Sequence, residues 1–297
     1  MNYLKTRLAP SPTGHLHLGH GFHILCVQGL AARFQADISV RIEDHDQSRC
    51  RPEFETSIIR DLEWLGVETP AKPWRQSTRS SVYQGHLETL RRQGLIYACA
   101  CSRKDIQQQT GQSSGELSYP GTCRDLCIPL DQAGTSLRLR LPTGRHPFRD
   151  VFLGDQISSL NPNYDLAIGD VVIRDRLGQW TYTFAVVIDD LEQEINFVIR
   201  GTDLLASTAR QLAMRQLIAP NSPTPIFAHH PLLKDAQGQK LSKRFFSEAL
   251  SKLRAEGLSP DDARGVAAHL GGLRESSRRV ALAEVPDLFT NIHRSPC

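Results

Sequence analysis

Residues 7–20 read RLAPSPTGHLHLGH, and the rest of the chain is best understood from this segment. Its two prolines and its first glycine interrupt regular structure, which predicts a loop between a preceding strand and a following helix. His17 and His20 lie three residues apart and therefore share a face of the first helical turn. Because a helix N-terminus offers unpaired N–H groups and the positive end of the helix dipole, this segment predicts a phosphate site.

A second basic segment lies far along the chain. Residues 240–244 read KLSKR and follow a glycine in a polar stretch. Lys240 and Lys243, with a hydroxyl group between them, are typical of a flexible loop that closes on a polyphosphate. Either segment alone is weak evidence, because short motifs often occur by chance. Their occurrence in one chain is more specific.

Together the two segments resemble the HIGH and KMSKS signatures of class I aminoacyl-tRNA synthetases. The extended first segment is similar to the glutamyl subgroup in particular, and so are RIEDHD at residues 41–46 and VVIDD at residues 186–190. The resemblance runs from residue 7 to about residue 244, which is most of the chain. It implies an α/β fold of the Rossmann-like class I type that binds ATP and an amino acid.

The composition is ordinary for a globular protein. The chain has 297 residues, of which 40% are hydrophobic and 23% are charged, enough for one large or two modest domains with a core. No apolar segment approaches a membrane span, and the N-terminus has no signal-peptide pattern. We expect a cytoplasmic protein that does not bind membranes and acts as a monomer. The net charge of +3 permits a basic face for nucleic acid but does not demand one.

The spacing of apolar residues predicts the local structure. A strand at 4–8, a helix at 18–34 and a strand at 38–42 form one βαβ unit, which binds ligands at the carboxyl ends of its strands. The other predicted elements are helices at 52–65, 79–92, 203–217 and 247–256, a helix that begins at Pro260 with Ser259 as its N-cap, strands at 136–141 and 195–199, and a hairpin of strands at 170–173 and 180–188. No GxGxxG fingerprint occurs, so we expect a nucleotide at the histidine motif.

These elements predict a Rossmann-like class I synthetase fold in four regions. Residues 1–95 and 191–244 form the two halves of the catalytic domain, residues 96–190 form a zinc-containing α/β insertion, and residues 245–297 form a small helical appendage. In class I synthetases such an insertion approaches the tRNA acceptor end. The appendage is too short to contain the helical domains with which longer glutamyl synthetases bind the anticodon.

The insertion contains a candidate zinc site, and seven cysteines in a cytoplasmic protein suit thiols or metal ligands better than disulfides. Structural zinc takes four ligands, usually sulfur, and Cys99, Cys101 and Cys123 provide three. Chemistry alone favours Cys127 as the fourth, because a phenol has a high pKa. The resemblance favours Tyr119, because small relatives of the glutamyl synthetases carry Cys-x-Cys followed by Tyr-x-x-x-Cys. We expect zinc on Cys99, Cys101, Tyr119 and Cys123, with Cys127 as the alternative.

Glutamate has two carboxylates and one ammonium group, and the chain offers complementary side chains. The resemblance assigns the glutamate pocket to Arg7, Ala9, Ser11, Glu43, Tyr182 and Arg200. Glu43 would receive the α-ammonium group, although the residues alone favour a loop carboxylate paired with Arg41 or Arg49. Arg200 can form two parallel hydrogen bonds with a carboxylate. One departure concerns Val186, because tRNA-charging glutamyl enzymes usually have an asparagine there. The loss of this amide is expected to weaken glutamate binding or to change the glutamate pose.

The resemblance implies two chemical steps. The α-carboxylate of glutamate attacks the α-phosphate of ATP, which gives glutamyl-AMP and pyrophosphate, and a nucleic-acid hydroxyl then takes the glutamyl group. Catalysis is assigned to His17, His20, Lys240 and Lys243. The histidines would bind the phosphates, Lys243 would stabilise the developing charge, and Lys240 would close the loop. ATP, accompanied by Mg²⁺, is expected to contact Arg7, Ser11, His17, His20 and Lys243.

Within the glutamyl subgroup, the short appendage, the cysteine–tyrosine set and Val186 resemble the glutamyl-queuosine tRNA(Asp) synthetases. Those enzymes activate L-glutamate without tRNA and place it on queuosine, the modified wobble base in the anticodon loop of tRNA(Asp). Three alternatives stay open: a minimal glutamyl-tRNA synthetase that charges tRNA 3′ ends, a catalytically silent zinc-containing tRNA-binding module, and a nucleotidyltransferase that uses another acid.

Overall fold

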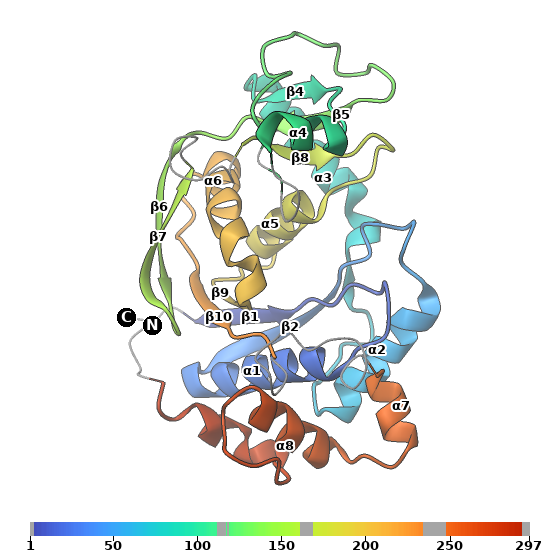
Figure 1. Ribbon diagram of the computed structural model, residues 1–297, viewed down its shortest axis with the longest axis vertical. Helices are drawn as coiled ribbons and strands as arrows, with labels where there is room; N and C mark the ends of the chain where they lie inside the picture. Colours follow the sequence, from blue (N-terminus) through green and yellow to red (C-terminus); the bar gives the residue numbers. More distant parts are fainter. Residues whose placement is uncertain (1–2, 112–116, 118, 161–168, 234–247, 293–297) are drawn as a thin grey trace.

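The computed structural model describes residues 3–111, 117, 119–160, 169–233 and 248–292 (Figure 1). The strands are β1 (Leu4–Leu8), β2 (Ala36–Ile42), β3 (Trp74–Arg75), β4 (Ile96–Cys99), β5 (Ser136–Leu139), β6 (Gly144–Asp150), β7 (Gly154–Leu160), β8 (Val171–Arg174), β9 (Phe197–Gly201) and β10 (Ile226–His230). The α-helices are α1 (Leu18–Phe34), α2 (Pro52–Trp64), α3 (Ser80–Arg92), α4 (Arg103–Thr110), α5 (Tyr182–Glu192), α6 (Thr208–Ile218), α7 (Leu250–Ala255) and α8 (Pro260–Leu270). The 3₁₀ helices are η1 (Gln76–Arg79), η2 (Thr202–Ser207) and η3 (Leu282–Phe289).

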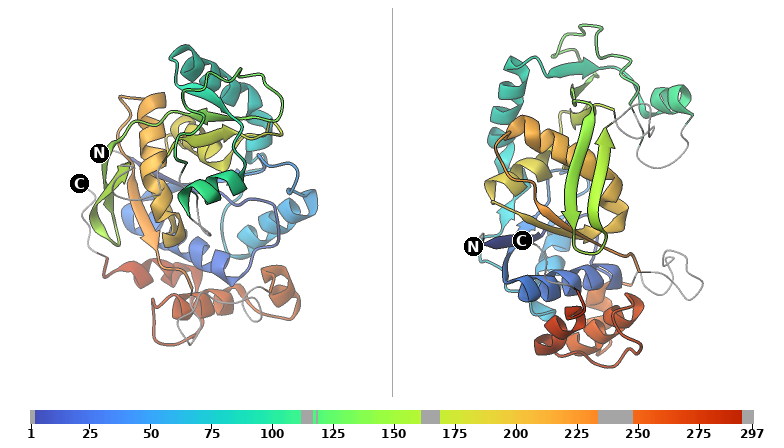
Figure 2. Two further views of the ribbon diagram at one scale, coloured as in Figure 1. Left: turned by 45° about the horizontal axis from the view of Figure 1, so that its top comes forward. Right: turned by 90° about the vertical axis from the view of Figure 1, so that its left-hand side faces the viewer.

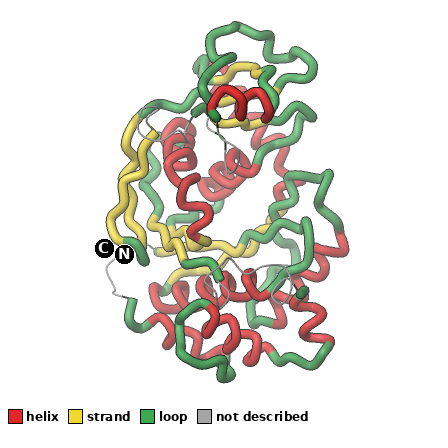
Figure 3. The backbone as a smooth tube through the Cα atoms, in the orientation of Figure 1, coloured by secondary structure: helices red, strands yellow, loops and turns green. Residues whose placement is uncertain are grey.

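Parallel strands from two distant parts of the chain lie side by side in the middle of the molecule (Figure 1). β1 pairs with β2, with Leu4 opposite Ala36, and β9 pairs with β10. The backbone N–H of Asn196 donates to the carbonyl oxygen of Lys5 at 3.2 Å and so joins the start of β9 to β1. Helix α1 covers one face of these strands, and α5 and α6 lie on the other (Figures 1 and 3). The result is the α/β layer of a Rossmann-like fold.

The first βαβ unit agrees with its prediction because its signals are local. The strand at 4–8 and the helix at 18–34 have the predicted limits, and β2 begins two residues before the predicted strand. The helices predicted at 52–65 and 79–92 are confirmed as α2 and α3 to within one residue at each end. The predicted helix at 203–217 begins instead as η2 and becomes α-helical at Thr208.

The prediction of a strand at 180–188 is wrong. Only β8 and an isolated bridge between Arg174 and Trp180 form there, and the chain turns into helix α5 at Tyr182. The run from Phe184 to Asp190 is buried on every side of this helix. A continuous apolar run has no period that separates a buried helix from a buried strand, so the β-branched residues misled the prediction.

A hairpin that the sequence did not predict extends the central sheet. β6 and β7 are antiparallel, and the strand order is β7-β6-β10-β9, with Asp150 of β6 opposite Phe227 of β10. Figure 2 shows this hairpin along one side of the molecule. Pro147 lies within β6, and a proline normally argues against a strand. The alternation of buried His146, Phe148 and Asp150 with exposed neighbours is the signal that could have found it.

β4, α4, β5 and β8 lie together at one end of the molecule (Figures 1 and 2). β4, β5 and β8 form an antiparallel sheet with β5 in the middle, so the strand predicted at 136–141 is confirmed as β5. Its pattern differs from a simple half-buried strand, because Arg138 is buried as well as Leu139. The guanidinium of Arg138 stacks over the ring of Tyr119 at 3.7 Å from the ring centroid.

The C-terminal elements pack beneath α1, at the other end of the molecule (Figure 1). The predicted N-cap of α8 is confirmed, since Ser259 Oγ accepts a hydrogen bond from the backbone N–H of Asp262 at 3.2 Å. Phe289 of η3 lies so close to Gly29 of α1 that a Cβ atom on this glycine would be 2.2 Å from the ring. The appendage therefore shares a hydrophobic core with the first half of the chain. No helix among the described residues has both the length and the apolar composition needed to cross a lipid bilayer.

Candidate active site

The carboxyl ends of the central strands bring several of the predicted site residues together. Arg7 lies near the end of β1, Glu43 directly follows β2, and Arg200 lies near the end of β9. Tyr182 is the first residue of α5, so the corrected helix starts at this edge of the sheet. In a parallel α/β sheet, this edge is where ligands bind. Segments separated by more than 150 residues in the sequence thus contribute to one site.

Arg7 and Glu43 belong to a buried network of alternating charges. Nε of Arg7 lies 3.1 Å from Oδ1 of Asp190, which also lies 2.9 Å from Nη1 of Arg41. Arg41 is completely buried, and its Nη2 donates to Oε1 of Glu43 at 2.9 Å. Burial raises the pKa of Asp190, but Arg7 and Arg41 outweigh it, so the pKa of this carboxyl lies below its ordinary value. The two arginines and the two carboxylates balance each other. The ion pair of Glu43 with Arg41 is one of the alternatives that the sequence offered, whereas Asp190 had been assigned no role.

Glu43 is a buried acid with which a cationic ligand could pair. Burial raises its pKa above the ordinary value even though Arg41 and Arg7 act in the opposite direction. An ammonium group near this carboxylate would favour its charged form. Tyr182 is close enough for Glu43 to raise the pKa of the phenol, although burial is the larger cause. Both observations are compatible with an α-ammonium group between these residues.

Arg200 differs from Arg7 because, among the residues that the structure describes, its hydrogen-bond partners are all neutral. Its Nε donates to Nε2 of His229 at 3.0 Å, and its terminal nitrogens donate to Oε1 of Gln211 at 2.5 Å and to Oγ1 of Thr208 at 2.7 Å. The side chain is almost fully buried, and burial lowers the pKa of Arg200 to about 10. A carboxylate ligand would supply the missing opposite charge directly.

The histidine motif forms an unusual helix cap. Nδ1 of His17 accepts from the backbone N–H of Gly19 at 3.1 Å, and Nδ1 of His20 accepts from the backbone N–H of His17 at 3.1 Å. The two ring centroids are 3.9 Å apart. Because both Nδ1 atoms accept, each neutral ring carries its proton on Nε2, where it can donate to a phosphate oxygen. The helix N-terminus thus binds its own histidines and leaves ring N–H groups available for a ligand.

The remaining predicted residues of this site are less informative. Ala9 is partly buried and Ser11 is exposed in the loop between β1 and α1. Val186 is buried within α5, next to the residues that form the charge network. Lys240 and Lys243 lie outside the described residues, so their assigned roles stay predictions.

A second pair of histidines, which the sequence analysis had not predicted, joins helix α1 to strand β10. Nδ1 of His23 lies 3.0 Å from Nε2 of His230, and Nδ1 of His230 lies 3.0 Å from the carbonyl oxygen of Pro231. The carbonyl oxygen can only accept, so His230 carries its proton on Nδ1 and donates it to Pro231. Nε2 of His230 therefore accepts a hydrogen bond from the Nδ1–H group of His23. Both rings are therefore neutral in this arrangement.

We expect acid to destabilise the fold through this pair. Burial lowers the pKa of His23 well below its ordinary value, and His230 and Arg7 lower it further. Burial also lowers the pKa of His230. Below about pH 6.5 the unfolded chain binds protons at these positions and the folded chain does not, so the free energy of unfolding falls as the pH drops, by up to about 1.4 kcal/mol per pH unit for each histidine.

Urea unfolding at pH 7 and pH 5 measures this effect. His23→Gln should reduce the loss of stability between the two pH values, because glutamine does not titrate. His269→Gln is the matched control, since His269 is exposed on α8, and it should retain the wild-type pH dependence. Equal pH dependence in wild type and His23→Gln would contradict the prediction.

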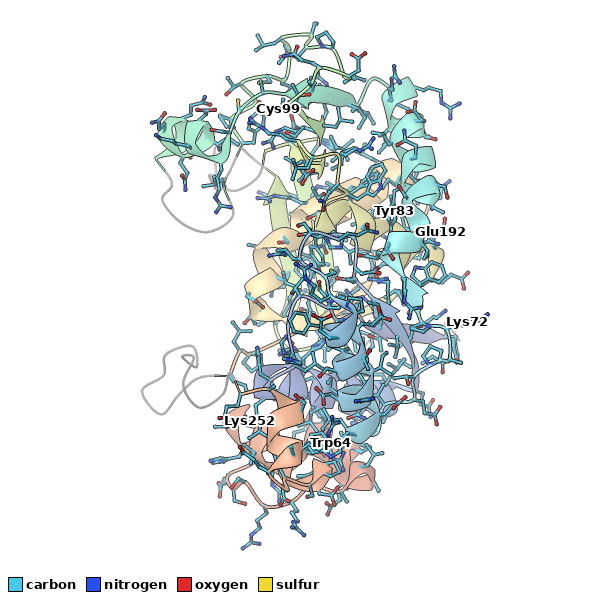
Figure 4. The ribbon with its side chains drawn as sticks, turned by 90° about the vertical axis from the view of Figure 1, so that its right-hand side faces the viewer. Trp64, Lys72, Tyr83, Cys99, Glu192 and Lys252 are labelled. Carbon is cyan, nitrogen blue, oxygen red and sulfur yellow. The ribbon has the colours of Figure 1, made fainter. Side chains whose placement is uncertain are left out.

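The three predicted cysteines meet at the far end of the molecule, where Figure 4 labels Cys99. The Sγ atoms of Cys99, Cys101 and Cys123 all lie within 4.8 Å of one another. Oη of Tyr119 lies 3.4 Å from Sγ of Cys99 and accepts from the backbone N–H of Cys123 at 2.7 Å. Tetrahedral zinc with bonds of about 2.3 Å to sulfur needs sulfur atoms roughly 3.8 Å apart, so this donor set fits the metal.

The alternative ligand does not join this group. Cys127 is exposed, and its Sγ lies 3.9 Å from the carbonyl oxygen of Asp125. Burial acts to raise the pKa of Cys123, yet hydrogen bonds, of which that of Tyr119 is the largest, lower it to about 7. Among the described residues, the geometry thus favours Tyr119 over Cys127 as the fourth donor.

Comparison with known proteins agrees with this fold. A family model described as the catalytic domain of class I tRNA synthetases (E and Q) matches residues 3–281. The glutamate-tRNA synthetase from Elizabethkingia anophelis has a similar structure, with a TM-score of 0.77 and 27% identity over 99% of this chain and 67% of that chain. The fold is that of a class I tRNA synthetase, and the protein is a ligase of the aminoacyl-tRNA synthetase type.

Two sequence relatives narrow the family. The glutamyl-Q tRNA(Asp) synthetase of Rhodobacter capsulatus is 38% identical over 273 residues, which cover 87% of this chain and 98% of that protein. The glutamate–tRNA ligase of Oleidesulfovibrio alaskensis is 33% identical over 99% of this chain, which spans 63% of the ligase. The chain belongs to the glutamyl-Q tRNA(Asp) synthetase family, with a glutamate–tRNA ligase-like activity that uses glutamate, tRNA and ATP with Mg²⁺.

Proposed function

We propose that the protein activates L-glutamate with ATP in the absence of tRNA and transfers it to queuosine in the anticodon loop of tRNA(Asp). The observation that carries this proposal is the full-length similarity to a glutamyl-Q tRNA(Asp) synthetase, which covers 98% of that relative. The grouping of Arg7, Glu43, Tyr182 and Arg200 at one strand edge supports glutamate as the amino acid. Val186 supports a pocket that differs from that of 3′-end-charging enzymes.

In the first step, an oxygen of the glutamate α-carboxylate attacks the α-phosphorus of ATP, and pyrophosphate leaves. This chain's residues would act chiefly by positioning and by stabilising charge. Arg200 would hold a carboxylate and Glu43 the ammonium group, while the Nε2–H groups of His17 and His20 would donate to phosphate oxygens. Lys243 would stabilise the developing charge and Lys240 would close the loop. Mg²⁺ bound to ATP would offset part of the phosphate charge.

In the second step, a hydroxyl of the queuosine cyclopentenediol attacks the acyl carbon of glutamyl-AMP, and AMP leaves with the bonding electrons. The anticodon loop would then lie where an acceptor stem lies in 3′-end-charging enzymes.

The division of the chain into four regions, with boundaries near residues 95, 190 and 244, stays a prediction. Because tRNA is the acceptor, the cytoplasm stays the predicted location, and the monomeric state also stays a prediction.

Transfer of radiolabelled glutamate to two tRNA pools tests the proposal. One pool comes from cells that make queuosine and the other from cells that cannot. We expect label only in the first pool, and we expect it to persist after enzymatic removal of the 3′-terminal adenosine. Equal label in both pools, lost on trimming, would establish 3′-end charging and overturn the proposal. No label in either pool, without glutamate-dependent pyrophosphate exchange, would indicate a catalytically silent protein.

We further propose that Cys99, Cys101, Tyr119 and Cys123 hold one structural zinc ion. Bound there, zinc would hold together β4 and the segment around Cys123. Purified protein is expected to contain about one zinc ion per chain, and Cys99→Ser is expected to lose it, as for other structural sites. Elemental analysis by mass spectrometry measures the zinc content. Cys127→Ser is the matched control and should keep the metal, whereas loss of zinc from this variant would make Cys127 a ligand.

A further inference from the structure

A buried chain of hydrogen bonds connects the β6–β7 hairpin to Arg200. Oδ2 of Asp150 lies 2.5 Å from Nδ1 of His229, and Nε2 of His229 accepts from Nε of Arg200 at 3.0 Å. The side chains of Asp150 and His229 have no exposed surface. Asp150 ends β6, His229 lies in β10 and Arg200 lies in β9, so the chain crosses three neighbouring strands of one sheet.

The direction of each hydrogen bond follows from the donors available. Arginine cannot accept, so Nε2 of His229 carries a lone pair and the ring proton lies on Nδ1, where it donates to Asp150. Burial lowers the pKa of His229, which agrees with a neutral ring. Oδ1 of Asp150 accepts from the backbone N–H groups of Phe152 and Leu153 at 2.9 and 3.1 Å, so the carboxylate is itself held in place.

Arg200 keeps two unused donors in this arrangement. A guanidinium has five N–H groups, and in the described part of the chain three of them bind His229, Thr208 and Gln211, which leaves two. One of these two lies on each terminal nitrogen, and the terminal nitrogens are donors that can bind a carboxylate. Phe227 adds a flat surface beneath, since the guanidinium carbon lies 5.2 Å from its ring centroid.

We infer that Asp150 and His229 are positioning residues that set the plane of the Arg200 guanidinium, and so the direction of its unused donors, for a carboxylate of the amino-acid substrate. This inference rests on the proposed function, because it takes Arg200 as the partner of that carboxylate. The charge of Asp150 keeps the imidazole proton on Nδ1. If the proton moved to Nε2, it would face the N–H of Arg200, and the guanidinium would turn away from its present plane.

Asp150→Asn is the direct test, because it keeps the shape of the side chain and removes the charge. Oδ1 of the asparagine can still accept from Phe152 and Leu153, so its NH₂ group faces His229 and forces the other tautomer. The KM for glutamate in pyrophosphate exchange is expected to rise about ten-fold or more, as when a partner that fixes a histidine tautomer is lost, while the KM for ATP stays near the wild-type value. Asp155→Asn on β7 is the matched control, because Asp155 is exposed.

Two variants of His229 separate positioning from general structural support. Glutamine can still accept from Arg200, whereas leucine fills a similar volume and cannot. We expect His229→Gln to have a KM for glutamate close to that of wild type. We expect His229→Leu to have a raised KM for glutamate, and both variants should have similar unfolding temperatures. Equal KM values for the two variants would overturn the inference.

The tautomer of His229 can also be measured in the wild-type protein. Long-range ¹H–¹⁵N correlation spectra at pH 7.5, assigned by the absence of one ring in His229→Gln, should show a neutral ring protonated on Nδ1. A ring protonated on Nε2, or a charged ring, would overturn the inference without any need for a folded Asp150 variant. If pyrophosphate exchange by the wild-type enzyme did not depend on glutamate, the proposed function itself would be overturned. If exchange by the wild-type enzyme depends on glutamate but Asp150→Asn has an unchanged KM for glutamate, only the present inference is overturned.

Discussion

Replacing Arg200 by alanine is expected to lower kcat/KM for glutamate in pyrophosphate exchange by about 10³-fold, which corresponds to about 4 kcal/mol. The physical reason is that Arg200 is a buried cation with only neutral hydrogen-bond partners in the described ranges of the chain, so a substrate carboxylate would be its direct counter-charge. Arg7 cannot replace it, because Asp190 already binds its guanidinium at 3.1 Å.

Two further variants sharpen this test. Arg200→Lys keeps the charge but loses the pair of parallel donors, so its effect should be smaller than that of alanine and should fall mainly on the KM for glutamate. Arg92→Ala is the matched control, because Arg92 is exposed at the end of α3. An Arg200→Ala enzyme with an unchanged KM for glutamate would remove Arg200 from the amino-acid pocket.

Lys243→Ala is expected to lower kcat for glutamate activation by about 10²–10³-fold, which is the usual cost of losing one preorganised group that stabilises transition-state charge. The KM for glutamate should change little, because the lysine is assigned to the phosphates and not to the amino acid. Pyrophosphate exchange at saturating ATP and glutamate measures the effect, and circular dichroism checks the fold.

Lys252→Ala provides the comparison for this second variant. Lys252 is exposed on α7, where it forms ion pairs with Glu248 and Glu256, and Figure 4 labels it near the end of the molecule opposite to Cys99. Loss of a surface ion pair has little effect on stability, and exchange should continue at the wild-type rate. A normal exchange rate in Lys243→Ala would remove this lysine from the mechanism.

Much of the fold could be predicted because its signals are short-range. Proline and glycine end segments, and alternation or helical spacing marks β1, α1, β2, α2 and α3 within windows of a few residues. The N-cap at Ser259 was predictable for the same reason. Prediction failed at α5, where burial on all sides removes the periodicity, and at β6, where Pro147 hides a strand whose alternation is otherwise regular.

The candidate site likewise has a part that could be predicted from short segments of sequence and a part that could not. The residues of the motif segments, such as His17, His20 and Glu43, could be proposed from sequence, because each stands at a recognisable position beside a strand or helix end. Tyr119 was predicted as a zinc ligand only because of the family resemblance. In the folded chain its Oη lies 3.4 Å from Sγ of Cys99. Arg41 was only an alternative partner for Glu43, and the role of Asp190 in pairing with both Arg7 and Arg41 was missed.

The sequence by itself determined the βαβ start of the fold, the position of the histidine motif and the cysteine spacing, since caps, turns and alternation act between residues close in the chain. Only the tertiary structure decided which charges pair and which stay available. Arg7 and Asp190 are 183 residues apart, and Asp150 and His229 are 79 apart. The first pair joins β1 to helix α5, and the second joins the neighbouring strands β6 and β10. Such pairs form only when distant segments pack together, and no local pattern records that packing.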